Sequence, residues 1–269
     1  MSSVHAGVSE CADMQSGSNT FRIMFSGLIL AVIANLPFYK WVFGSSWQWV
    51  DGFPLGWIGV GLTYMCVFFH EIGHTVFAWF YGYMTIPVFD FQNGGGLALS
   101  FEGQKLFIIF FGYALIGYWV VVFKEYRILQ IFLVILLGVN LATAFNDVHQ
   151  AVINFMGHGM VSMIAGFFLM RVLFNLCPGG ALERYLNAFF GFGMILQSYI
   201  DASGLLKNDS YRLSYFRQKG SHGFGDFDKI DDQFLSFSFQ DIIWFWILWN
   251  SVFLTLPFVL YFMWGRNRI

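Results

Sequence analysis

Seven long apolar stretches constrain what this chain can fold into more than any other feature of its sequence. A helix that crosses a bilayer needs about 20 mostly apolar residues, because the hydrocarbon core is about 30 Å thick. The stretches that approach this length run roughly over residues 21–43, 56–82, 105–123, 128–145, 159–177, 185–200 and 242–264. The sixth is the shortest. The sequence therefore predicts an all-α polytopic membrane protein, multi-pass and integral to the membrane, with about six or seven transmembrane helices.

The low charge content supports this prediction and excludes one class of partner. Hydrophobic residues make up 57% of the chain and charged residues 11%, whereas a soluble domain carries about 25% charged residues. The net charge of −2 offers no basic surface that would neutralise phosphates, so nucleic acid is not an expected partner. The expected partners are membrane lipid and either a transmembrane protein substrate or partner subunits.

The apolar stretches divide the chain into four regions. Residues 1–20 are polar and lack both a basic start and an apolar core, which argues against a signal peptide, and we expect a disordered tail. Residues 21–200 form the predicted membrane domain, and residues 241–269 form a C-terminal transmembrane helix. Between them, residues 201–240 hold much of the charge and form the expected extramembrane loop. Lys and Arg are divided too evenly between the two sides for the positive-inside rule to give the orientation.

The second stretch contains three polar residues in the pattern H-E-x-x-H. His70, Glu71 and His74 form the pentad HEIGH. Positions i and i+4 lie on one face of a helix, so both imidazoles can reach one Zn²⁺, and the adjacent glutamate is placed to take a proton from a water on the metal. Ionisable side chains near the bilayer centre are costly unless they pair, face water or bind a metal. The motif therefore predicts a zinc site with Glu71 as its base.

Other interpretations of the motif are weaker. Histidine and glutamate within a helix bundle can form a structural polar network with each other and with neighbouring carbonyls. Membrane di-iron enzymes need several histidine boxes, and the chain has only six histidines. Haem ligation has no C-x-x-C-H support. Cys66 lies four residues before His70, but a small thiol packed within a helix is the more common arrangement.

The motif and the residues after it resemble the site-2 protease family of intramembrane zinc metalloproteases. HEIGH is followed by TVFAWFYGYMTIPVFDFQNGGGLAL, in which Gly73 and the glycines at 94–96 stand where that family has small residues and a Gly-rich turn. The similarity covers approximately residues 60–175. It implies that His70 and His74 are zinc ligands, and that Glu71 is the general base and acid of peptide hydrolysis inside the membrane.

The third ligand is where the chain departs from that family. The family usually supplies an aspartate from an N-P-x-x-D-G or L-D-G element, and this chain has no such element. It has FNDVHQAVINFMGHGM instead, in the connection expected between the fourth and fifth stretches. Asp147, His149 or His158 in this connection would complete a three-ligand site with an open fourth position. Asp147 and His158 are the two candidates, and for each a solvated loop position is the alternative. The connection would have to dip into the membrane, where irregular backbone must be covered by protein or water.

Two further segments have a structural and a functional interpretation. The segment NGGGLALS would pair with an extended substrate by strand addition, or it is a plain loop between two spans. In GFGDFDKIDD, four aspartates cluster without the glycine that an EF-hand loop requires, so we interpret this segment as a solvated acidic surface.

These patterns favour one function and leave two alternatives. The favoured function is an intramembrane zinc metalloprotease that hydrolyses a peptide bond of a membrane-embedded substrate by attack of zinc-bound water, assisted by Glu71. The first alternative is a non-catalytic integral subunit of a larger membrane complex that retains a metalloprotease-like fold. The second is a zinc-dependent membrane protein that handles metal without proteolysis.

Overall fold

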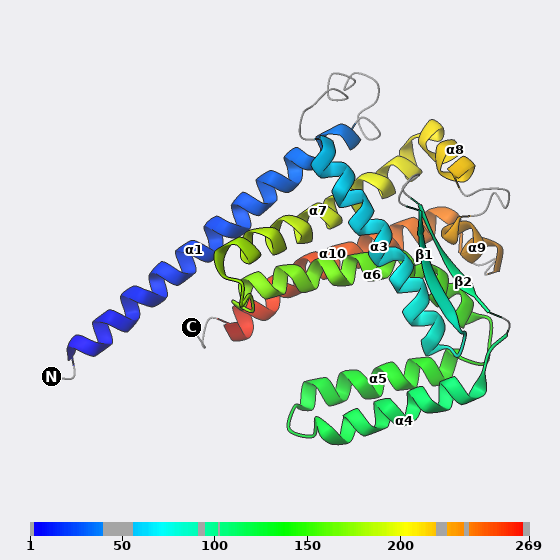
Figure 1. The fold of residues 1–269 in the computed structure, drawn as a ribbon, viewed down its shortest axis with the longest axis horizontal. Helices are drawn as coiled ribbons and strands as arrows, with labels where there is room; N and C mark the ends of the chain where they lie inside the picture. Colours follow the sequence, from blue (N-terminus) through cyan, green and yellow to red (C-terminus); the bar gives the residue numbers. More distant parts are fainter. Residues whose placement is uncertain are drawn as a thin grey trace. The chain divides into compact units, whose positions relative to one another are not determined.

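The structure is a computed structural model that describes residues 3–39, 56–90, 95–101, 103–218, 225–233 and 237–265. Most of the described chain is helical, as predicted, and a two-stranded hairpin is added (Figure 1). The elements are α1 (Ser3–Asn35), η1 (Leu36–Phe38), α3 (Gly56–Phe80), β1 (Thr85–Asp90), β2 (Gly95–Ser100), α4 (Leu106–Val122), α5 (Arg127–Thr143), α6 (Val148–Leu173), α7 (Gly180–Lys207), α8 (Asp209–Gln218), α9 (Asp226–Gln233), α10 (Phe239–Leu260) and η4 (Tyr261–Gly265).

Three helical segments of the described chain are long and apolar enough to cross a membrane. They are Asn19–Phe38, Val148–Leu173 and Phe239–Trp264. Helices α4 and α5 are apolar but have only 17 residues each, which corresponds to about 25 Å of helix. Length and composition in the structure thus identify three membrane-spanning candidates rather than the six or seven that the sequence predicts. Residues 40–43, the end of the first predicted stretch, lie outside the described residues.

The N-terminal region differs from its prediction. Helix α1 begins at Ser3, so most of the polar segment that was predicted to be a disordered tail is helical. The segment contains no proline, and extending an existing helix adds one hydrogen bond for each residue without a new nucleation step. The apolar part of α1 therefore provides a helix that the polar residues continue toward the N-terminus.

Helix α6 corrects the position of the predicted connection. It begins at Val148, so the segment that holds His149 and His158 is helix and not loop. His158 is flanked by Gly157 and Gly159. In a helix of a membrane protein, such small residues let neighbouring helices pack closely. His158 therefore needs no irregular backbone at depth.

The all-α prediction omits the hairpin of β1 and β2. The strands pair antiparallel, with Ile86 opposite Leu99 and Val88 opposite Leu97. These four side chains lie on one face of the hairpin and are exposed. On the other face, Thr85 and Ser100 share a hydrogen bond of 2.9 Å between their hydroxyls. This second face lies against α3, because the Phe89 ring stacks on Phe68 at 5.0 Å between centroids.

The chain divides into two compact units. Unit 1 comprises residues 1–66, 161–214 and 243–269, and unit 2 comprises residues 67–160 and 215–242. In unit 1, α1 packs along α7, and a Cβ on Gly27 would lie 2.5 Å from the Cβ of Ala188. Small residues at the helix contact let the two backbones approach, as in other membrane helix pairs. Unit 2 contains the motif HEIGH, the hairpin, the α4–α5 pair and α9.

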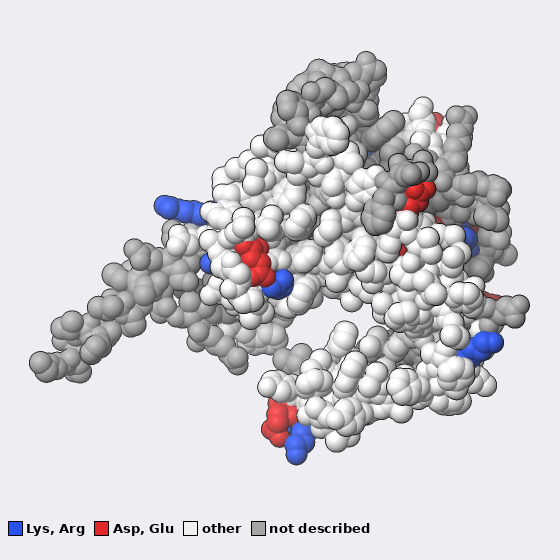
Figure 2. All heavy atoms as spheres, in the orientation of Figure 1, with Lys and Arg blue, Asp and Glu red and all other residues white. Residues whose placement is uncertain are grey.

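Charged side chains are sparse on the surface. Figure 2 shows one face on which small groups of acidic and basic side chains are separated by large uncharged areas. One such group lies at the turn between α4 and α5, where the sequence has Lys124, Glu125 and Arg127. Exposed apolar side chains such as Phe107, Phe111 and Val121 cover the α4 surface. An apolar exterior of this kind is compatible with membrane association.

Candidate metal centre

Two glycines let α3 and α6 pack closely within unit 2. Gly73 belongs to HEIGH, and a Cβ at this position would collide with the carbonyl oxygen of Met156 and lie 2.7 Å from the Cβ of Met160. Gly157 lies on the facing helix, where a Cβ would collide with the His74 Nε2 atom and lie 2.7 Å from the Cε1 atom of His70. The absent side chains provide the space in which the two imidazoles lie.

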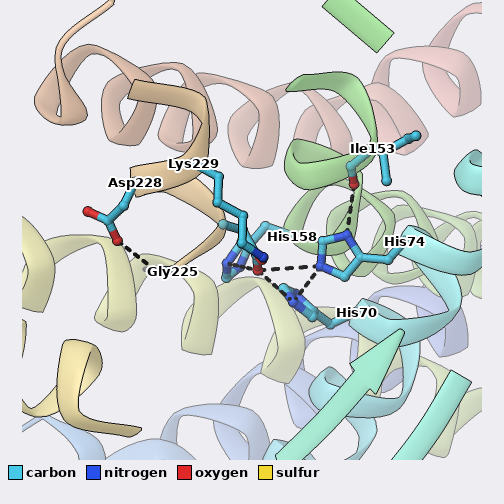
Figure 3. Close-up of polar contacts among 8 residues, drawn as sticks. His70, His74, Ile153, His158, Gly225, Asp228 and Lys229 are labelled. Carbon is cyan, nitrogen blue, oxygen red and sulfur yellow. Dashed lines mark hydrogen bonds and ion pairs between the residues drawn. The ribbon is translucent and has the colours of Figure 1, made fainter. Parts of the chain in front are cut away.

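Four ligand-type side chains converge at this helix contact, and we call them the histidine–aspartate cluster: His70, His74, His158 and Asp226 (Figure 3). The Asp226 Oδ2 atom lies 3.0 Å from the His70 Nε2 atom and 3.3 Å from the His74 Nε2 atom. The two Nε2 atoms are 3.0 Å apart. The His158 Nε2 atom is farther, at 4.0 Å from Asp226 Oδ2. Ligand atoms of His70, His158 and Asp226 all lie within 4.8 Å of one another.

The hydrogen bond on the far side of His74 fixes its tautomer. Its Nδ1 atom lies 2.8 Å from the carbonyl oxygen of Ile153, which can only accept, so we assign the hydrogen to Nδ1. In the neutral ring, Nε2 then presents a lone pair toward the other members of the cluster. A backbone carbonyl that fixes the tautomer in this way is the usual outer partner of a metal-ligating histidine.

The distances in the cluster fit a tetrahedral zinc ion. Ligand atoms around Zn²⁺ are about 3.3 Å apart when the bonds are about 2.0–2.1 Å long. The separations among the His70, His74 and Asp226 ligand atoms are 3.0, 3.0 and 3.3 Å. A nitrogen lone pair that faces a carboxylate oxygen and a second imidazole at these distances requires a proton or a cation between them. Two imidazoles and a carboxylate form a common ligand set of catalytic zinc.

Asp226 is a site residue that the sequence analysis missed. It begins α9, within the segment interpreted as a solvated acidic surface, yet the residue is only 8% exposed. Its neighbour Phe227 is fully buried, and Ile230 is buried one turn later, so α9 has an apolar face that packs inward. The Asp228 carboxylate accepts a hydrogen bond of 2.9 Å from the Gly225 backbone amide at the helix start. In the sequence, the signal for this buried face was the i, i+3 spacing of Phe227 and Ile230 within an otherwise polar segment.

Lys229 is the outer partner of Asp226. Its Nζ atom lies 3.7 Å from Asp226 Oδ1, the carboxylate oxygen that does not face the histidines. The lysine side chain is 48% exposed, so water screens part of this attraction. Figure 3 shows its amine directed toward the cluster from α9. An ammonium group at Oδ1 orients the carboxylate so that Oδ2 faces the imidazoles.

Glu71 lies between α3 and the hairpin. The residue is 6% exposed, and a Cβ on Gly96 in β2 would lie 2.8 Å from its Cδ and Oε1 atoms. Any larger residue at position 96 would therefore displace the carboxyl group. The hairpin brings the backbone of β2 beside the residue that the motif assigns as the base.

The remaining predicted residues lie elsewhere. Asp147 is exposed in the turn before α6 and is not a member of the histidine–aspartate cluster. His149 is buried, and its Nε2 atom lies 2.7 Å from the Tyr83 hydroxyl. Its Nδ1 atom bonds the carbonyl of Asn146, so both ring nitrogens have structural partners. Cys66 belongs to unit 1, where its thiol lies 3.8 Å from Gln197 Oε1.

Comparisons with known proteins add no further identification. The chain matches no family model, no curated protein and no solved structure. The functional argument therefore rests on the residues of this chain.

Proposed function

We propose that this chain is an intramembrane zinc metalloprotease of the site-2 protease type, multi-pass, with six or seven transmembrane segments. The observation that carries the proposal is the convergence of His70, His74 and Asp226, next to the buried Glu71 of the same motif. These three side chains would hold the zinc ion. A bound Zn²⁺ lowers the pKa of a coordinated water and polarises a carbonyl group.

Glu71 would perform the proton transfers of peptide hydrolysis. Its carboxylate takes a proton from water as the water oxygen bonds to the substrate carbonyl carbon. The same proton then passes to the amide nitrogen as the C–N bond breaks, which leaves a carboxylic acid and an amine. Burial of Glu71 beside β2 limits the access of other water and fixes the carboxyl group. His74, oriented by the Ile153 carbonyl, and Asp226, oriented by Lys229, keep the ligand set in place.

The edge of β2 that does not pair with β1 in the hairpin favours a peptide substrate that binds in extended form. β2 pairs with β1 along one edge, and no third strand of the described chain pairs with its other edge. A segment added at that edge would hydrogen-bond through its backbone and pass the glycine that contacts Glu71. Recognition through backbone places few demands on substrate sequence. A transmembrane helix would have to unwind locally to bind in this way.

The non-catalytic subunit is the weaker alternative. It was favoured by the absence of the family's third-ligand element from the sequence. Asp226 supplies a carboxylate in that role, from another part of the chain. A scaffold would also have no need of Glu71 in a buried position beside two imidazoles.

The test separates metal binding from hydrolysis. Detergent-purified wild type and Glu71→Gln are compared for zinc content by elemental analysis and for cleavage of a co-expressed single-span membrane protein. We expect about one zinc per chain in both proteins, because Glu71 is not a ligand. Cleavage by Glu71→Gln should fall by about 10²–10⁴-fold, the usual contribution of a general base.

Glu125→Gln is the matched control, because Glu125 is an exposed glutamate in the α4–α5 turn and should change neither zinc content nor cleavage. Wild type that folds without binding metal would contradict the proposal. So would a silent Glu71→Gln substitution in a protein that co-purifies stoichiometrically with other subunits, and that result would favour the scaffold alternative.

A further inference from the structure

His158, the fourth member of the histidine–aspartate cluster, lies farther from Asp226 than the other two histidines do. The His158 Nε2 atom is 4.0 Å from Asp226 Oδ2, which exceeds the distance of about 3.3 Å expected between two ligands of one tetrahedral zinc. The corresponding distances from His70 and His74 to Asp226 Oδ2 are 3.0 and 3.3 Å. Four protein ligands would close the site, whereas catalytic sites keep one position open. His158 is therefore close to the ligand set without completing it.

Packing holds the His158 ring at this distance. The Phe227 ring stacks on it with centroids 4.4 Å apart and an angle of 18° between the planes. The His70 ring approaches with its centroid 4.4 Å away at an angle of 76°. Phe227 is fully buried and packs edge-on against Phe239. These ring contacts restrict the orientation of the His158 imidazole.

The chemistry of the neutral ring then determines what His158 can do. The Asp226 Oδ2 atom, an acceptor, lies 4.0 Å from the His158 Nε2 atom, so we assign the hydrogen to Nε2. The Nε2 atom is buried, and it lies on the side of the ring that faces the Asp226 carboxylate within the cluster. Hydrogen-bond donors fixed near a developing negative oxygen are among the largest contributors to enzymatic rate.

We propose that His158 is a further catalytic residue, whose Nε2–H donates to the substrate carbonyl oxygen as that oxygen gains negative charge. This inference rests on the proposed protease function and names the group that stabilises its transition state. It also reassigns His158, which the sequence analysis considered as a third zinc ligand, to a position beside the three ligands His70, His74 and Asp226.

The test uses the full-length, detergent-purified protein loaded with Co²⁺ in place of zinc. His158→Phe keeps a ring that can stack on Phe227 but removes the donor, and His158→Gln restores a donor. The readouts are cobalt content, the visible spectrum of bound cobalt, the affinity for acetohydroxamate and the cleavage kinetics. His149→Phe is the matched control, because His149 is another buried histidine of α6 and bonds Tyr83.

We expect His158→Phe to bind one cobalt per chain with the wild-type spectrum, because the ligands are unchanged. Acetohydroxamate, whose oxygen would lose the donated hydrogen bond, should bind about tenfold more weakly, and kcat should fall by about 10²-fold with KM nearly unchanged. His158→Gln should recover part of both losses. His149→Phe should match wild type in cobalt content and in hydroxamate affinity.

Two results would overturn the inference. Loss of cobalt or a changed resting spectrum in His158→Phe would make His158 a ligand, and unchanged hydroxamate affinity would remove its role as donor. Circular dichroism and melting of His158→Phe distinguish loss of metal from loss of fold, and His158→Gln repeats the measurement with a polar side chain. Wild type that binds cobalt and hydroxamate but cleaves nothing would refute the protease function, while the hydroxamate comparison would still decide the role of His158.

Discussion

The two units bury different kinds of polar side chain. In unit 1, every buried polar side chain among the described residues is an amide or a hydroxyl: Thr20, Asn35, Ser162, Asn187, Gln197, Ser198 and Asn250. Unit 2 buries ionisable groups as well, namely Glu71, His74, His149 and Asp226. Because the chain as a whole carries little charge, we attribute this difference in buried side chains to the different roles of the polar groups in the two units.

Neutral polar groups in a helix bundle connect helices. Gln197 donates a hydrogen bond of 2.7 Å to the Thr63 hydroxyl, and the Ser162 hydroxyl donates to Asn250 at 2.5 Å. Each of these pairs joins a donor to an acceptor without an ion. In the histidine–aspartate cluster, by contrast, acceptors face each other, and an ion or proton is required to stabilise them. The comparison teaches that convergence of ionisable groups, rather than burial of polar groups alone, marks the candidate site.

The largest expected effect follows from removal of the carboxylate ligand. In Asp226→Ala, zinc would have two imidazole ligands instead of three protein ligands, and we expect zinc affinity to fall by more than about 100-fold, beyond the range caused by outer-shell changes. Competition of the purified protein against a zinc chelator measures this affinity. Asp231→Ala on the same helix and Asp147→Ala before α6 are the controls and should keep wild-type affinity. If Asp226→Ala binds zinc as tightly as wild type, the buried ionisable groups of unit 2 do not form the metal site, and the distinction between the two units is wrong.

A smaller effect is expected from the outer partner of that carboxylate. Lys229→Met removes the ammonium group that lies 3.7 Å from Asp226 Oδ1. Changes in the outer shell weaken metal binding by about 10–100-fold, and the half-exposed position of Lys229 places the expected loss near tenfold. The same chelator competition measures it. Lys229→Arg retains the charge and should restore most of the affinity, and failure of this rescue would contradict an electrostatic role.

The smallest effect is expected in unit 1. Gln197→Met removes the hydrogen bond to Thr63 with little change of volume, while Thr63 keeps a hydrogen bond of 3.1 Å to the Gly59 carbonyl. We expect unfolding free energy to fall by about 0.5–1.5 kcal/mol, the range for hydrogen bonds between membrane helices, and zinc content to stay unchanged. Melting in detergent and elemental analysis measure the two quantities. A loss of zinc here would show that the polar groups of unit 1 serve the metal site.

Local sequence patterns predicted the helices that are specified by residues close together in the chain. The stretch predicted at 56–82 is α3, Gly56–Phe80, and the stretch at 105–123 is α4, Leu106–Val122. The prediction began this helix at residue 159 and left Gly157 in the connection, whereas α6 begins at Val148. In a packed membrane helix the same glycine makes room for a neighbour, and only the neighbour reveals this role.

The sequence by itself determined that this is a mostly helical, apolar chain with a pair of histidines and a glutamate on one helix. Composition is a sum over residues, and the i, i+4 spacing of His70 and His74 is fixed by helix geometry wherever the helix lies. Only the tertiary structure decided which carboxylate joins them. Asp226 reaches the pair because Phe227 and Ile230 are buried beneath α9, and His158 because Gly73 and Gly157 let α6 approach α3. These contacts join residues far apart in the chain, and no local periodicity specifies them.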